Sequence, residues 1–159
     1  MVVVAGAGAG GAVHECGLCG ARFGERRAVR ESALEAEALR RGVAPEVWPL
    51  AKVLDALPGF ALGSACGRAQ GELPMVTLIV SGQEALVQLE NLAKVLRLAA
   101  GRLRCRWSIE VRFEQALVVV VYATGPASSA RDACVDVEEL AQQVDRSSRL
   151  SWWRHATDW

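Results

Sequence analysis

Two adjoining stretches of the chain predict a β-hairpin, and this hairpin limits the folds that the other segments can adopt. Residues 102–113, RLRCRWSIEVRF, alternate strictly between polar and apolar positions. Residues 116–124, ALVVVVYAT, form a continuous apolar run, which is typical of a strand covered on both faces. Gly125 and Pro126 then end the second strand. The sequence therefore predicts an antiparallel sheet that other elements must cover.

Helical patterns flank this hairpin. Residues 25–41 and 45–57 are rich in helix formers and are separated by Gly42, so they predict a helical hairpin. Residues 84–100 predict a helix opened by a capping box of Ser81 and Glu84. The apolar stripe expected on that helix consists of Leu86, Leu89, Ala93, Leu96 and Ala100. Residues 129–144 predict the last helix.

The order of these elements indicates the fold class. A strand at residues 75–81 precedes the helix at 84–100, so the order from residue 75 is strand, helix, strand, strand, helix. This is most of a split βαβ arrangement. We expect an α+β fold, within the broad α/β group: a helical hairpin, then a mixed, largely antiparallel sheet with helices on one face. The expected division is a flexible Gly/Ala-rich leader with a C-x-x-C at 1–22, one α+β domain at 23–146 and a Trp-rich C-terminal tail at 147–159.

Composition excludes several classes of protein. Hydrophobic residues make up 52% of the chain and charged residues 23%, which favours a folded core over global disorder. Lys plus Arg and Asp plus Glu number 18 each, so no overall field attracts nucleic acid or membrane. The longest internal apolar run falls far below the roughly 20 residues of a membrane helix. We expect no membrane partner and, without a basic signal region at the N-terminus, a cytoplasmic location.

The first residues carry two motifs that imitate functional sites. Gly6, Gly8 and Gly11 match the spacing of a dinucleotide-binding turn, but no amphipathic helix follows them, so the match is spurious. His14, Cys16 and Cys19 are candidate zinc ligands. A second ligand pair is missing from the chain, which favours a free or oxidisable dithiol over an intrachain zinc site.

Two internal stretches are candidate binding sites. In residues 63–68, GSACGR, backbone amides, the Ser64 hydroxyl and the Arg68 guanidinium could converge on a carboxylate or phosphate beside Cys66. A plain turn, with Cys66 buried and Arg68 solvated, is the alternative interpretation. The second candidate is an arginine-bearing strand face that could bind an RNA backbone or could simply be solvated. Its members are Arg102, Arg104, Arg106 and Arg112.

Three segments resemble a known family. RAVRESALEAEALRRGVAPEVWPLAKVLDALPGFALGSACGR, VTLIVSG and EVRFEQALVVVVYATGPASSARDA are similar to stretches of the wybutosine-synthesis methyltransferases, over residues 27–144. The resemblance implies S-adenosylmethionine-dependent methylation of a tricyclic, wyosine-type guanosine derivative in tRNA. It also implies that Ser64, Cys66 and Arg68 are catalytic and that Gly63, Ser64 and Gly67 bind the cofactor.

The sequence therefore supports several hypotheses. The first is a tRNA-modification protein that binds RNA, S-adenosylmethionine or both, with an orienting role in methyl transfer if it is an enzyme. The second is a non-enzymatic interaction or RNA-binding module that self-associates or binds a partner, using its apolar sheet and tryptophan tail. The third is a zinc-stabilised adaptor that uses Cys16 and Cys19.

Overall fold

A computed structural model describes residues 2–4, 13–15, 22–67, 73–113, 115–150 and 153 of the chain. Its principal elements follow the predicted order of two helices, two strands, a helix, two strands and a final helix. The helices are α1 (Glu25–Arg40), α2 (Trp48–Asp55), α3 (Ala85–Ala99) and α4 (Ala130–Ser148). The strands of the main sheet are β4 (Phe60–Cys66), β5 (Met75–Val80), β6 (Arg106–Phe113) and β7 (Leu117–Thr124). The predicted α+β class is confirmed.

The main sheet has four strands in the order β4-β5-β7-β6. Each neighbouring pair is antiparallel, so the main sheet is wholly antiparallel. The expected sheet was largely antiparallel but mixed. Because β5 and β6 both run antiparallel to β7, which lies between them, they are parallel to each other and are joined through α3. This is the split βαβ arrangement that the order of elements predicts.

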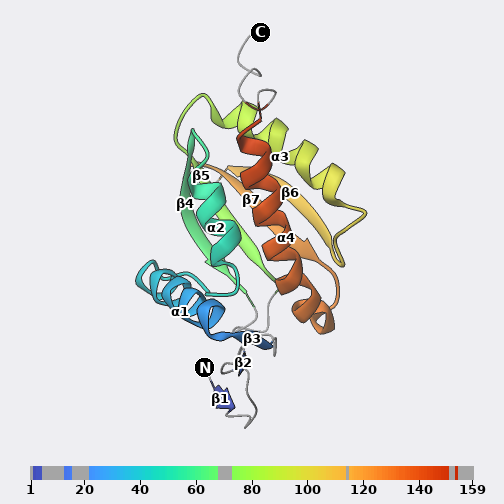
Figure 1. Ribbon diagram of the computed structural model, residues 1–159. Helices are drawn as coiled ribbons and strands as arrows, with labels where there is room; N and C mark the ends of the chain where they lie inside the picture. The colour runs from blue at the N-terminus through green and yellow to red at the C-terminus, as the bar shows by residue number, and fades with distance from the viewer. Residues whose placement is uncertain are drawn as a thin grey trace.

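The helices α2, α3 and α4 lie on one face of the main sheet (Figure 1). Apolar side chains on that face are fully buried, among them Val76, Leu78, Val119 and Val121. The helices contribute Leu54, Leu92, Val137 and other buried residues to the same core. Within the described residues, none of these helices covers the opposite face, which we call the open face, although Val120 on that face is only 3% exposed.

The junction between β6 and α4 depends on Asp136, a carboxylate that is only 2% exposed. It accepts hydrogen bonds from the backbone N–H groups of Arg104 and Cys105, at 2.9 and 2.8 Å, and from Trp107 Nε1 at 3.2 Å. These bonds hold residues 102–105 against α4 as an irregular segment. The strand therefore starts at Arg106, and the strict alternation predicted a strand that was four residues too long.

The burial of α3 differs from the predicted stripe. Leu86 is 70% exposed, and Ala93 and Ala100 are also exposed. The buried face instead includes Gln88 and Asn91. The capping box is also absent, since Glu84 occupies the N-cap without a side-chain hydrogen bond. Apolar residues surround this helix, so their periodicity alone does not identify its inner face.

The chain ends differ from the expected pattern in the parts that the structure describes. Three short strands, β1 (Val2–Val4), β2 (Val13–Glu15) and β3 (Arg22–Gly24), form a small antiparallel sheet, of which β1 and β2 lie within the predicted leader and β3 crosses its end. Helix α4 continues to Ser148, past the predicted domain end. In the predicted tail, Trp153 is 3% exposed and is part of the core. None of the helices in the described ranges is long and apolar enough to span a membrane.

Candidate functional site

The residues predicted to form a site lie on β4, at one edge of the main sheet. Residues 60–66 are all strand, so Ser64 and Cys66 belong to a strand and not to a turn. The pairing register with β5 shifts between Leu62 and Ser64, which makes Gly63 the extra residue of a β-bulge. Ser64 is exposed and Cys66 is half-buried. Arg68 lies outside the described residues, so its place in the site stays a prediction.

The two glycines predicted to bind a cofactor have packing roles in the fold. A Cβ at Gly67 would lie 2.8 Å from both Glu46 Oε1 and Val47 Cγ2, which is closer than real Cβ atoms approach. A Cβ at Gly63 would lie 3.2 Å from the carbonyl oxygen of Thr77. Close packing against the segment before α2 and against β5 is therefore sufficient to explain both glycines.

The strand register brings Ser64 and Cys66 beside polar residues from the other strands. Ser64 pairs with Thr77 of β5. Cys66 pairs with Met75, which pairs with Tyr122 of β7, which pairs with Ser108 of β6. Directly paired residues project from the same face of a sheet. Because their neighbours Ala65, Val76 and Val121 are buried under the helices, these side chains belong to the open face.

We call this set the open-face row. Its members are Ser64, Cys66, Met75, Thr77, Ser108 and Tyr122. It offers four hydroxyl groups, a thiol and a thioether across the four strands of the sheet. Tyr122 is the chain's single tyrosine and is half-buried on a central strand. The arrangement suits a flat polar ligand that lies against the sheet.

Two of the four predicted RNA-binding arginines share this face. Arg106 pairs with Thr124, one step along the strands from the pair of Tyr122 and Ser108. Arg112 lies toward the other end of β6 and contacts Glu110 at 2.8 Å. The hydrogen bond from Arg112 lowers the pKa of Glu110 below its usual value. Glu110 is therefore a carboxylate at neutral pH, and it offsets part of the positive charge.

The other two arginines are directed toward α4. Arg104 Nη1 lies 3.1 Å from Asp132 Oδ1, and Arg102 Nη1 lies 4.0 Å from Glu139 Oε1. The backbone N–H groups of Arg104 and Cys105 donate to Asp136 of α4, so residues 102–105 do not continue the strand. The structure thus divides the predicted arginine face into two pairs, of which only Arg106 and Arg112 accompany the open-face row.

Cys105 is a poor candidate for a nucleophile. Burial raises the pKa of its thiol, and the negative charges of Asp136 and Asp132 raise it further. The thiol is therefore protonated at neutral pH, whereas the nucleophilic form of cysteine is the thiolate. His14 lies in β2, and Cys16 and Cys19 lie outside the described residues. Within the described part of the chain, no group of three His, Cys, Asp or Glu residues could hold a metal ion.

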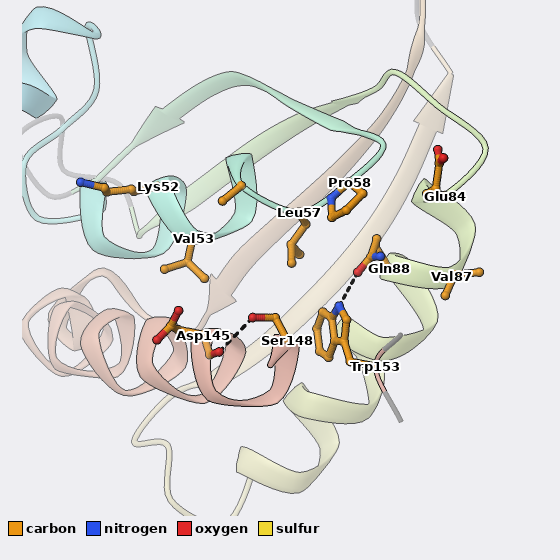
Figure 2. Close-up of a pocket in the computed structure, with 11 residues that line it drawn as sticks. Lys52, Val53, Leu57, Pro58, Glu84, Val87, Gln88, Asp145, Ser148 and Trp153 are labelled. Carbon is orange, nitrogen blue, oxygen red and sulfur yellow. Dashed lines mark hydrogen bonds between the residues drawn. The ribbon is translucent and has the colours of Figure 1, made fainter. Parts of the chain in front are cut away.

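A pocket of about 640 Å³ lies on the opposite, helical side of the molecule, between α2, α3 and α4 (Figure 2). Its lining includes Leu57 and Val87, with the charged groups of Lys52, Glu84 and Asp145 around it. The indole Nε1 of Trp153, which also lines it, donates a hydrogen bond to Gln88 Oε1 at 2.5 Å. No sequence pattern predicts this pocket, because its residues come from three separate helices and the chain end.

The pocket and the open-face row cannot form one active site. The pocket adjoins Leu57 and Pro58, just before β4 begins, whereas Cys66 is at the other end of this strand of seven residues. At about 3.3 Å per residue, the two ends of β4 lie roughly 20 Å apart. The sheet itself also separates the two sites. Any reaction that uses Ser64 or Cys66 must therefore take place on the open face.

The fold and the site define an α+β protein whose four-stranded antiparallel sheet has helices on one face and a row of polar side chains on the other. No family model matches the chain, and no curated protein matches it. Among solved structures, it is similar to the PH1069 protein from Pyrococcus horikoshii at 15% sequence identity and a TM-score of 0.41. That similarity covers 80% of this chain and 94% of the other.

Proposed function

We propose that the chain is a cytoplasmic tRNA-modification protein that methylates a wyosine-type nucleoside, with S-adenosylmethionine as the methyl donor. The open face of the sheet would bind the RNA. The sequence resemblance over residues 27–144 suggests the reaction. The observation that carries the proposal is the open-face row, because it gathers residues of four strands beside the motif that bears the resemblance.

The chemistry of the open face suits a nucleoside. An unstacked base can lie on an aromatic ring, and Tyr122 offers a ring on a central strand. The hydroxyl group of Ser108, which pairs with Tyr122, can donate to and accept from base edges and ribose oxygens. Arg106, one step away, can contact a phosphate. Since the net charge of the chain is zero, such local contacts must supply the affinity for RNA.

The donor set of this face also fits S-adenosylmethionine, which when bound would supply a methyl group activated by a sulfonium sulfur. Ser64 and Thr77 form a pair of neighbouring hydroxyls that could bond the ribose of the donor. The role of the protein would then be to hold donor and acceptor in line, and orientation of this kind can supply a large part of the rate enhancement.

Transfer of labelled methyl groups tests the proposal. Purified protein is incubated with labelled S-adenosylmethionine and tRNA from cells that lack the modification. We expect incorporation by the wild type, a loss of roughly 100-fold in Ser64→Ala and Tyr122→Ala, since misplaced reactants cost rates of this order, and an unchanged rate in Arg149→Ala. Arg149 is the matched control because it is exposed at the end of α4, away from the open face.

Three other outcomes would contradict the proposal in part or in whole. Tight tRNA binding with no incorporation would identify an RNA-binding module without methyltransferase activity. Incorporation that all three variants support equally would remove the open face from the reaction. The absence of both tRNA binding and incorporation would contradict the whole proposal.

A further inference from the structure

The main sheet has two edge strands, and one of them is capped. On β4, the backbone N–H of Leu62 donates to Asp55 Oδ1 at 2.7 Å. The carbonyl oxygen of Ala65 accepts from the N–H of Ala44 at 3.4 Å. The bulge at Gly63 further interrupts this edge. Side-chain caps and bulges of this kind prevent another strand from pairing with an edge.

The other edge strand, β6, has none of these protections. All eight residues pair with β7 in one continuous register, without a bulge or a proline. From Trp107 to Val111, the backbone groups on the outer side of β6 have no hydrogen-bond partner within the described part of the chain. A regular edge with unpaired N–H and C=O groups is a template for another strand.

Exposed apolar side chains lie beside this edge, at the end of β6 that leads into β7. Val111 and Phe113 alternate with Arg112, so they project on the same face as the buried Trp107. Val111 is nevertheless 48% exposed and Phe113 is 80% exposed. Leu117, the pairing partner of Phe113, is 36% exposed. The end of the hairpin therefore presents an apolar surface beside an unpaired backbone.

We propose that β6 is a homodimer interface, and that it pairs antiparallel with β6 of a second copy about a two-fold axis at Val111. This register places Glu110 of each copy opposite Arg112 of the other, so two pairs of opposite charge form on the open face. On the helical face, Ile109 of each copy lies opposite Phe113 of the other. The apolar side chains that are exposed in one copy thus cover those of the second copy.

Charge and apolar complementarity together select this register among the symmetric ones. An axis at Ser108 would also place Arg106 of each copy opposite Glu110 of the other, but Val111 and Phe113 would then lie opposite residues 103–105, outside the strand, and their apolar side chains would not be covered by a second strand. An axis at Glu110 would place the two glutamates opposite each other. An axis at Ile109 would place Arg106 of each copy opposite Arg112 of the other. Like charges in directly opposed positions are unfavourable. The Val111 register also extends the open face continuously across both copies, independently of which ligand that face binds.

Two single variants test the pairing. Glu110→Arg places two arginines opposite each other, and Arg112→Glu places two glutamates opposite each other. We expect the wild type to sediment at twice the mass of the chain at about 100 µM. Each variant alone should dissociate at least ~10-fold more readily, because like charges oppose one another across the interface. Mixing the two variants should restore the dimer, since every opposed pair is then again Arg with Glu.

The mixture separates pairing between copies from effects within one chain. Neither single variant retains the intrachain contact between Glu110 and Arg112, so its loss cannot explain a rescue on mixing. Arg106→Glu is the control, because Arg106 lies outside the paired segment. The dimer of this variant should dissociate as readily as the wild-type dimer. Circular dichroism and urea unfolding verify that each variant is folded. A wild type that stays monomeric at 100 µM, or folded variants that show no association on mixing, would overturn the proposal.

Discussion

At the scale of single residues, a few buried polar groups join separate segments on the helical side of the sheet. Asp136 accepts three donors from residues 104–107, and this explains both the start of β6 and the separation of the four arginines. Gln88 and Asn91 have a similar role at Trp153. Buried polar groups of this kind stabilise a fold only when their partners are present.

Replacing Asp136 tests the first of these groups. In Asp136→Ala, three buried or partly buried N–H groups lose their acceptor, so we expect the free energy of unfolding to fall by about 3 kcal/mol or more. Asp136→Asn keeps one acceptor oxygen, so the free energy of unfolding should fall by less in this variant. Urea unfolding measures both. Asp132→Ala is the control, since it removes only an exposed contact with Arg104 and should change stability by less than about 1 kcal/mol. Equal losses in Asp136→Ala and Asp132→Ala would contradict this account.

The contact of Glu37 with α2 predicts a dependence of stability on pH. The hydrogen bond from Lys52, at 3.0 Å, is the main cause that lowers the pKa of Glu37, and Trp48 Nε1 adds to it. A lowered pKa in the folded state means that the contact stabilises the fold above the unfolded pKa of about 4.3. This stabilisation is lost as the pH falls through the lowered value.

We therefore expect the urea midpoint of Glu37→Gln to lie below that of the wild type at pH 7 and to approach it near pH 3. In a Lys52→Met background, Glu37→Gln should change the midpoint much less at pH 7. A difference that persists unchanged at low pH, or that does not depend on Lys52, would show that Glu37 acts through another contact.

At the scale of elements, the C-terminal segment contributes to the core through α3. Trp153 Nε1 donates to Gln88, and Asn91 Nδ2 donates to the carbonyl oxygen of Trp153 at 3.1 Å. These bonds explain why two amide side chains occupy the inner face of α3 while Leu86 is exposed. The tail therefore determines which face of this helix is buried.

A pair of variants tests this relation. Trp153→Phe removes the indole donor and leaves Gln88 Oε1 without it, so we expect a loss of about 1 to 3 kcal/mol in the free energy of unfolding. Adding Gln88→Leu should recover part of this loss, because replacing both partners with apolar groups removes the unsatisfied acceptor. Urea unfolding of the two variants gives the comparison. A double variant that is less stable than Trp153→Phe would contradict the prediction.

The elements were predictable to the extent that their signals are local. The alternation in residues 106–113 predicts that strand, and Gly42 predicts where α1 ends. The inner face of α3 was not predictable, because its bonds join residues that lie 62 and 65 positions apart in the sequence. The same holds for residues 102–105, whose alternation continues although Asp136 binds their backbone.

At the scale of the whole molecule, one packed and one open face determine where function can lie. The run of valines in β7 predicts burial on both faces, and Val120 on the open side is buried, whereas Val118 and Tyr122 on that side are half-buried. Valines on both sides of a strand do not reveal that, within the described residues, the helices α2, α3 and α4 cover only one of those sides. The position of Tyr122 in one row with Cys66, Met75 and Ser108 therefore follows only from the strand register.

The dependence of tRNA binding on salt concentration is the most direct test of the open face as the RNA-binding surface. We expect Arg106→Ala to weaken binding and to reduce the slope of log K against log salt by about 1, as the loss of one phosphate contact does. Tyr122→Ala should weaken binding about 10-fold without changing the slope, because stacking releases no counterions. Arg149→Ala should change neither quantity. A Tyr122→Ala variant that binds like the wild type, or equal effects of Arg106→Ala and Arg149→Ala, would contradict the account.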